Sequence, residues 1–315
     1  MSSILLSPEI SVELFLEFLL LFVLSFTLLQ AIYILKYYKK GTTTELQYSL
    51  EKKSYLVGVV IGISLIIKIV LVAFFAYSLD ELSVIVPGAM CAAGVVSSNL
   101  YGEPLLLLKL LILLLASLWL LLNRADVHVA DAPYFKKKLY LFIVLYILIL
   151  LEFFTSVNFL TLIETQNPVL CCSVIYTDSS NPIPFNMSNF QLITLFYMLY
   201  FVVFLSAIYK NKKLLFISSI LFVYISYYAL VYFFSTYIYE LPTHKCPFCM
   251  LQKEYYYVGY FIYSALFLAI FYTSGFMLFK FMNYAYKRLI LFFTLFVLIL
   301  SSYFLIYIIS NGVLL

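Results

Sequence analysis

Apolar residues gather into eight long runs along the chain, and short polar connections separate them. An α-helix needs roughly 20 apolar residues to cross the hydrocarbon core of a bilayer, and each run is about that long. The pattern therefore predicts an all-α polytopic membrane protein with about eight transmembrane helices. We interpret the first run as a retained helix, because no basic residue precedes it and no small-residue cleavage motif follows it. The runs cover approximately residues 12–35, 55–79, 105–122, 139–163, 190–209, 214–238, 253–279 and 289–310.

The composition agrees with this prediction. Hydrophobic residues make up 65% of the 315 residues and charged residues only 11%, whereas soluble domains carry about 25% charged residues. The net charge of +4 is therefore interpreted by its position along the chain and not as a sign of nucleic-acid binding. We expect contact with membrane lipid and none with nucleic acid.

The basic residues predict the orientation. Most of the 19 Lys and Arg residues lie in the connections that follow the first, third, fifth and seventh runs. Basic connections stay on the cytoplasmic side of a membrane. We therefore expect these four connections in the cytoplasm, both chain termini outside, and a location in the inner (cytoplasmic) membrane of a bacterial cell. Residues 80–104, 164–189 and 239–250 would then form the outer connections.

All five cysteines, Cys91, Cys171, Cys172, Cys246 and Cys249, lie in these three outer connections. Cysteines that serve only as small buried apolar side chains would also occur within the spans. On the oxidising outer side of a bacterial inner membrane, paired cysteines are expected to form disulfides or to bind metal. All five are therefore candidate redox residues on the extracytoplasmic side.

Cys246 and Cys249 form a CxxC motif in the stretch HKCPFCM, where a polar connection becomes an apolar run. The spacing lets the two sulfurs meet within one turn and cycle between dithiol and disulfide. We expect Cys246 to be exposed at the start of a helix, with Pro247 in the first helical position. The positive end of that helix, with Lys245 and Lys253, would favour the thiolate of Cys246. The motif predicts a nucleophilic Cys246 with Cys249 as its resolving partner.

Other uses of the motif are also open. Covalent haem attachment needs CxxCH, and Met250 stands in the place of the histidine, so no haem is expected. A soft metal such as copper(I) or zinc suits thiol, imidazole and thioether ligands. A scaffold or transporter whose cysteines only join its loops is a third possibility. The candidate metal ligands are His244, Cys246, Cys249 and Met250, with Cys171 and Cys172 available to complete the site.

The stretch CPFCMLQKEYYYVGY resembles the signature of the DsbB family, membrane enzymes that pass electrons from thiols to quinone. Many members have C-P-x-C-x-x-Q-R followed by Pro-Tyr-Tyr. The match covers about a dozen residues of this chain, and Lys253 replaces the usual arginine. The resemblance implies that the residues after the motif contact a quinone. The matching positions are Cys246, Pro247, Cys249, Gln252, Tyr256 and Tyr257, and the implied quinone contacts are Gln252, Lys253, Tyr256 and Tyr257.

The order of elements is similar to that of the related vitamin K epoxide reductase (VKOR) family. That family has a four-helix bundle with shuttle cysteines after its first helix and a CxxC at its fourth. The resemblance implies a redox bundle in residues 139–279, accessory helices in 1–138 and a final helix in 280–315. A thioredoxin-like protein would then pass electrons through a loop disulfide that involves Cys171 or Cys172, whose partner could be Cys91, to Cys246–Cys249 and on to quinone. In the family the two loop cysteines are separated, whereas Cys171 and Cys172 are adjacent. An alternative is that one of Cys91, Cys171 and Cys172 is a plain loop residue without a redox role.

Two charged residues fall near the middle of spans. Lys68 lies in the second run and Glu152 in the fourth. Ionisable residues at such depth are costly and rare, so they suggest either a functional site or an ion pair. We expect Lys68 and Glu152 to form an ion pair that stabilises packing, and a proton relay is the alternative.

Overall fold

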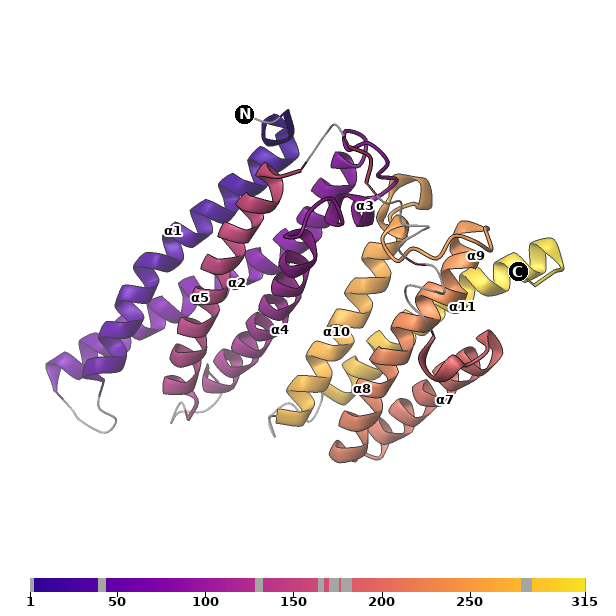
Figure 1. The fold of residues 1–315 in the computed structure, drawn as a ribbon. Helices are drawn as coiled ribbons and strands as arrows, with labels where there is room; N and C mark the ends of the chain where they lie inside the picture. The colour runs from indigo at the N-terminus through magenta and orange to yellow at the C-terminus, as the bar shows by residue number, and fades with distance from the viewer. Residues whose placement is uncertain are drawn as a thin grey trace. The chain divides into compact units, whose positions relative to one another are not determined.

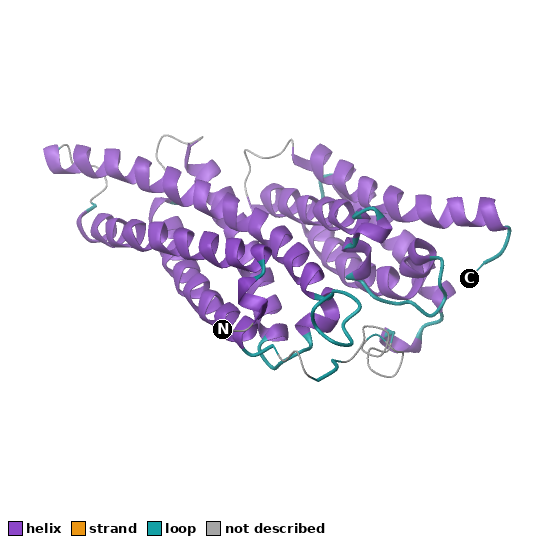
Figure 2. Cartoon of the chain, turned by 90° about the horizontal axis from the view of Figure 1, so that it is seen from above, coloured by secondary structure: helices purple, strands orange, loops and turns teal. Residues whose placement is uncertain are grey.

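The computed structural model describes residues 3–38, 44–127, 133–163, 167–169, 176, 183–278 and 285–314. Within these residues, eight helices are long and apolar enough to cross a membrane, and no strand occurs (Figures 1 and 2). The prediction of an all-α polytopic membrane fold is thereby confirmed. The helices are α1 (Pro8–Tyr37), α2 (Glu45–Leu82), α4 (Gly102–Val127), α5 (Phe135–Thr161), α7 (Asn189–Ile208), α8 (Lys212–Ala229) with its extension to Tyr239, α10 (Val258–Leu278) and α11 (Ala285–Asn311).

Local sequence explains where several helices begin. The side chain of Thr44 accepts a hydrogen bond from the backbone N–H of Gln47 at the start of α2. Ser188 and Gln191 form a reciprocal capping box at the start of α7. Asn211 accepts from the N–H of Leu214 and begins α8. Each of these side chains satisfies a backbone donor that has no partner within the helix.

The chain divides into two compact units, Met1–Ile85 with Val96–Thr165, and Val86–Val95 with Gln166–Leu315. In the first unit, α1 packs on α2 and α5, and α4 packs on the same two helices. Its core contains the fully buried Trp119, whose indole N–H donates to the carbonyl oxygen of Lys138 at 2.9 Å. Figure 1 shows these four helices in indigo to magenta.

The second unit packs α7 on α8 and α10 on α11. The α8 helix passes through a π-helical turn, Leu230–Phe234, into the short helix α9 (Ser235–Tyr239). Aromatic rings form much of the core of the second unit. The centroid of the Phe222 ring lies 5.2 Å from that of Phe196 and 5.5 Å from that of Phe293. Such pairs add to the free energy gained by burying the rings. They connect α7, α8 and α11.

The predicted division at residue 138 differs from the division between these units. The fourth span, α5, packs on α1 and α4, and so belongs to the same unit as the first three spans. The second unit contains the last four spans instead. The redox role predicted for residues 139–279 is a separate matter and stays a prediction.

Candidate functional site

Three cysteine side chains meet in the second unit. The sulfur atoms of Cys91, Cys246 and Cys249 all lie within 4.8 Å of one another. The Cys91 and Cys246 sulfurs are 3.6 Å apart, although 155 positions separate these residues in the chain. The three side chains are at most 2% exposed, and no disulfide joins them to one another. The fold therefore adds Cys91 to the CxxC pair as a third buried thiol.

Two tyrosines hold the backbone of the motif. The Tyr239 hydroxyl, at the end of α9, donates to the carbonyl oxygen of Cys246. The Tyr263 hydroxyl, on α10, donates to the carbonyl oxygen of Pro247 at 2.5 Å. The backbone N–H of Phe248 lies 3.4 Å from the sulfur of Cys246 and donates to it.

The motif does not begin a transmembrane helix, so that prediction is wrong. The helix α10 begins at Val258 and not at Pro247. Two short 3-10 turns, Cys249–Leu251 and Lys253–Tyr255, come first. Gln252 between them has an extended backbone, and Tyr256 and Tyr257 have positive φ angles of 53° and 54°, which the α-helix excludes.

The expected exposure of Cys246 is also wrong, because the side chain is 1% exposed. Without a helix start at Pro247, the helix dipole does not act on this thiol. Lys245 places its ammonium 5.0 Å from the ring centroid of Tyr232, in a cation–π contact. The Lys253 side chain is exposed. The polar contacts of the Cys246 sulfur include the N–H of Phe248 at 3.4 Å and the sulfur of Cys91 at 3.6 Å.

The implied quinone contacts lie at the edge of this site. The side-chain amide of Gln252 donates to the carbonyl oxygen of Met90 at 3.0 Å, which ties the motif to the loop of Cys91. Tyr256 is 85% exposed and Tyr257 is 37% exposed. An apolar groove of about 390 Å³ lies between α10 and α11, and none of the four implied residues lines it. Its lining includes Val258, Phe261, Leu268, Leu295 and Tyr303.

His244 and Met250 lie beside the thiols in different ways. The His244 ring packs edge-on against the Tyr239 ring at 4.5 Å, and its buried Nε2 has no hydrogen-bond partner. His244 is not part of the three-thiol group that the described residues form. Met250 is fully buried under the start of α10, where a Cβ on Gly259 would lie 2.7 Å from its Cγ.

Cys171 and Cys172 lie outside the described residues, but described residues on both sides of them contact the site region. The backbone N–H of Val169 donates to the carbonyl oxygen of Pro87 at 2.9 Å. Gly88 has a φ of +82°, and a Cβ there would lie 2.7 Å from the Val169 carbonyl oxygen. Burial first, and then the nearby Cys246, raise the pKa of Tyr176 well above its usual range. Tyr176 is therefore close enough to Cys246 to interact with it electrostatically.

Sequence reasoning missed the tyrosines that surround this site. Tyr176, Tyr239 and Tyr263 come from three separate parts of the chain, and they are three of 30 tyrosines. No spacing marked them. Their shared property is a position beside the thiols, which the fold alone creates.

A scan against protein-family models, a search of curated proteins and a search of solved structures found no match to this chain. The assignment of a role to the three thiols therefore rests on their own geometry.

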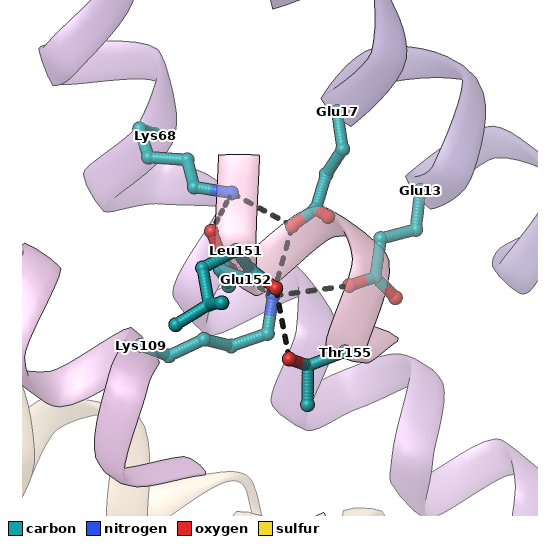
Figure 3. Close-up of polar contacts among 7 residues, drawn as sticks. All are labelled: Glu13, Glu17, Lys68, Lys109, Leu151, Glu152 and Thr155. Atoms are coloured by element: carbon teal, nitrogen blue, oxygen red, sulfur yellow. Dashed lines mark hydrogen bonds and ion pairs between the residues drawn. The ribbon is translucent and has the colours of Figure 1, made fainter. Parts of the chain in front are cut away.

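A second buried polar cluster lies in the first unit, and it consists of charges (Figure 3). Lys68 contacts Glu17 at 2.9 Å and Glu152 at 2.6 Å, and Lys109 contacts the same carboxylates at 2.8 and 2.7 Å. These four residues, one from each helix of the unit, form a closed ring of alternating charge, named here the charge ring. The predicted pair of Lys68 and Glu152 is confirmed as one side of this ring.

A fifth residue, Glu13, lies one turn from Glu17 on α1 and is fully buried. Its closest lysine contact is to Lys109 at 3.7 Å, and neither of its carboxylate oxygens has a hydrogen-bond partner. Sequence analysis did not single out Glu13 or Glu17. The available signal was their spacing, because positions i and i+4 share one face of a helix.

Proposed function

We propose that the protein is a membrane thiol-disulfide oxidoreductase that passes electrons from an outer-face thioredoxin-like protein to membrane quinone and so supports disulfide formation. The observation that carries this proposal is the meeting of three buried thiols from two separate loops. Cys246 lies within reach of both Cys91 and Cys249. A thiol with two alternative partners is what disulfide exchange requires.

The exchange step balances within the site. In the oxidised state Cys246 and Cys249 form a disulfide. The thiolate of Cys91 attacks the sulfur of Cys246, a Cys91–Cys246 bond forms, and Cys249 leaves as a thiolate. The thiolate of Cys171 or Cys172 then attacks the sulfur of Cys91, the Cys91–Cys246 bond breaks, and Cys246 leaves as a thiolate. The thioredoxin-like donor reduces the new disulfide between Cys91 and the loop cysteine and is itself oxidised. The dithiol of Cys246 and Cys249 then gives two electrons and two protons to a quinone, which becomes quinol, and the Cys246–Cys249 disulfide forms again.

Burial of the three thiols explains why the loop of Cys171 and Cys172 is part of the proposal. A thioredoxin-like protein approaches from solvent, and Cys246 is 1% exposed. Cys172 stands four residues before Tyr176, so an extended chain limits their separation to about 14 Å. Tyr176 interacts electrostatically with Cys246 and Cys91. The loop cysteines are therefore proposed to receive electrons outside and transfer them to Cys91.

The apolar groove between α10 and α11 is the proposed site for the quinone. Its volume of about 390 Å³ is within the range of about 300–1,000 Å³ that small-molecule sites occupy. It begins at Val258, the first residue of α10, and α10 follows the motif directly. Gln252, Lys253, Tyr256 and Tyr257, the residues that resemble the DsbB signature, would contact the quinone headgroup at the membrane surface.

The orientation is part of the same proposal. Donor proteins for disulfide formation are found in oxidising compartments. Both chain termini and the loops of all five cysteines are proposed to lie outside the inner membrane, as the basic connections indicate. A membrane-impermeant thiol reagent should label Cys171 and Cys172 in intact cells. Labelling only after the membrane is opened would contradict this orientation.

The test uses purified protein in detergent, reduced and freed of reductant, then mixed with a soluble short-chain quinone. Quinone absorbance should fall with wild type and with the exposed control Ser302→Ala. It should stay constant with Cys246→Ser and Cys249→Ser. With reduced thioredoxin as the donor, Cys91→Ser should block turnover, but a single turnover by the chemically reduced pair should remain. Constant quinone absorbance with wild type would contradict the proposal.

A second candidate function is metal handling, which the three-thiol group favours. Three thiolates within 4.8 Å suit copper(I) or zinc, because soft metals prefer sulfur ligands. The relevant ligands would be Cys91, Cys246 and Cys249, with His244 and Met250 at the edge. Binding of one copper(I) per chain that Cys91→Ser abolishes, together with no quinone reduction, would support this function over the first.

A further inference from the structure

We propose that the first unit binds one exchangeable proton inside the membrane span, on the carboxyl group of Glu13. The charge ring beside it, Lys68, Glu17, Lys109 and Glu152, makes Glu13 the one surplus acid of the cluster. This inference concerns a different unit from the thiols and does not depend on the proposed redox function.

The charge ring is complete without Glu13. Each lysine contacts both ring carboxylates, at distances from 2.6 to 2.9 Å. Two positive and two negative charges therefore cancel within it. Glu13 is a third carboxyl group beside two ammonium groups that are already matched.

The ammonium group of Lys109 has few hydrogen-bond donors left for Glu13. An ammonium group has three donors. Lys109 donates to Glu17 and Glu152 and also lies 4.1 Å from the ring centroid of Phe75, in a cation–π contact. The Glu13 oxygen remains 3.7 Å away and forms no hydrogen bond with it.

An ionised carboxylate in this position would be very costly. Glu13 is 0% exposed, and a buried charge without matching hydrogen bonds is neutralised in preference to being kept. The charged groups that face it are Glu17 on its own helix, Lys109 on α4, Lys68 on α2 and Glu152 on α5. These four sum to zero, so a proton on Glu13 makes the whole cluster neutral.

The proton can move from Glu13 to Glu17 because the two carboxyl groups share Lys109. The two carboxyl groups lie one helical turn apart on α1, and both point toward the Lys109 ammonium (Figure 3). If the proton moves from Glu13 to Glu17, Lys109 changes its stronger contact from Glu17 to Glu13. The number of charges is the same before and after, so the transfer needs no ion from outside.

Charge counting makes the proposal testable by infrared difference spectroscopy, which detects the C=O stretch of a protonated buried carboxyl group. Wild type at neutral pH should show one such band, shifted in D₂O. Glu13→Gln should lose it. Glu152→Gln should lose it too, because Glu13 then ionises and replaces the missing ring carboxylate. Lys68→Met should double its intensity, because a second carboxyl group loses its counter-charge.

The control is Glu103→Gln, at the exposed start of α4, which should keep the wild-type band. Glu13→Gln has the shape of the protonated side chain, so its thermal unfolding temperature should match that of wild type. This variant keeps the test valid even if Lys68→Met does not fold. A band that persists in Glu13→Gln, or in Glu152→Gln, would overturn the proposal. A second result would also overturn the proposal. In that result, wild type shows no such band, and sodium raises its unfolding temperature whereas a large organic cation does not. Glu13 would then hold a metal cation in place of a proton.

Discussion

The two units bury polar groups in opposite ways. The charge ring of the first unit takes one ionised side chain from each of four helices, and every member contacts two partners of opposite charge. The thiol site of the second unit takes three uncharged groups from two loops, and Cys246 has a choice of two partners. A membrane protein can bury charges when they cancel, because their attraction offsets the lost hydration. It can bury thiols without such matching, since a neutral thiol behaves as a small apolar group.

We therefore expect substitutions in the charge ring to affect mainly stability, and substitutions of the thiols to affect mainly the proposed reaction. Removing a lysine of the charge ring takes the counter-charge away from buried carboxyl groups, which lowers the free energy of unfolding. Removing a thiol costs little free energy but eliminates a bond that the proposed reaction must form.

Cys246→Ser should reduce thiol-driven quinone reduction to the uncatalysed rate, because serine forms no disulfide with Cys91 or Cys249. Its free energy of unfolding should fall by no more than about 1–3 kcal/mol, the cost of burying a hydroxyl group. The measurements are quinone absorbance and denaturant unfolding in detergent. Residual turnover at half the wild-type rate would remove Cys246 from the mechanism.

Lys109→Met should lower the free energy of unfolding by about 3–5 kcal/mol, because it leaves buried carboxylates without their counter-charge. The measurement is denaturant unfolding followed by tryptophan fluorescence, since Trp119 lies in the core of the same unit. The matched control is Lys36→Met on the exposed face of α1. This substitution should change the free energy of unfolding by less than about 0.5 kcal/mol. Equal effects of the two substitutions would show that the charge ring does not hold the unit together.

Gly259→Ala should lower the free energy of unfolding by about 1–3 kcal/mol through overpacking. The new Cβ would lie 2.7 Å from Met250 Cγ and 3.0 Å from the Met250 carbonyl carbon, next to Cys249. Quinone reduction should therefore fall as well. Gly62→Ala on α2 is the control, because its nearest contact would be an ordinary 3.7 Å to Trp119. If Gly259→Ala is as stable as Gly62→Ala, α10 does not pack tightly against the motif.

Tyr263→Phe should cost about 0.5–1.5 kcal/mol, the net contribution of one hydrogen bond. It removes the donor to the Pro247 carbonyl oxygen. Tyr140→Phe, at a position 60% exposed, should have no measurable effect in thermal unfolding. A loss confined to activity, with stability unchanged, would mean that Tyr263 takes part in the chemistry and not only in holding the turn.

The sequence by itself determined the membrane class and the positions of the spans. Hydrophobic runs are a local property, and a helix that crosses a bilayer needs a minimum apolar length whatever its neighbours are. The predicted runs agree with the helices of the structure within about five residues at most ends, but α2 begins at Glu45, ten residues before the predicted 55, and α10 begins at Val258, after the predicted 253. The depth of Lys68 and Glu152 along their spans was likewise enough to predict their pairing.

Only the tertiary structure decided which distant groups meet. Cys91 joins the CxxC motif across 155 positions, and Glu13, Glu17 and Lys109 join the predicted ion pair from two further helices. The start of α10 was also decided by packing, because Met250 and Leu251 fit beneath Gly259 and because Tyr239 and Tyr263 hold the carbonyl groups of Cys246 and Pro247 just before them. Local patterns predict how each helix forms, but contacts between helices depend on side-chain packing, for which one sequence offers no period or spacing.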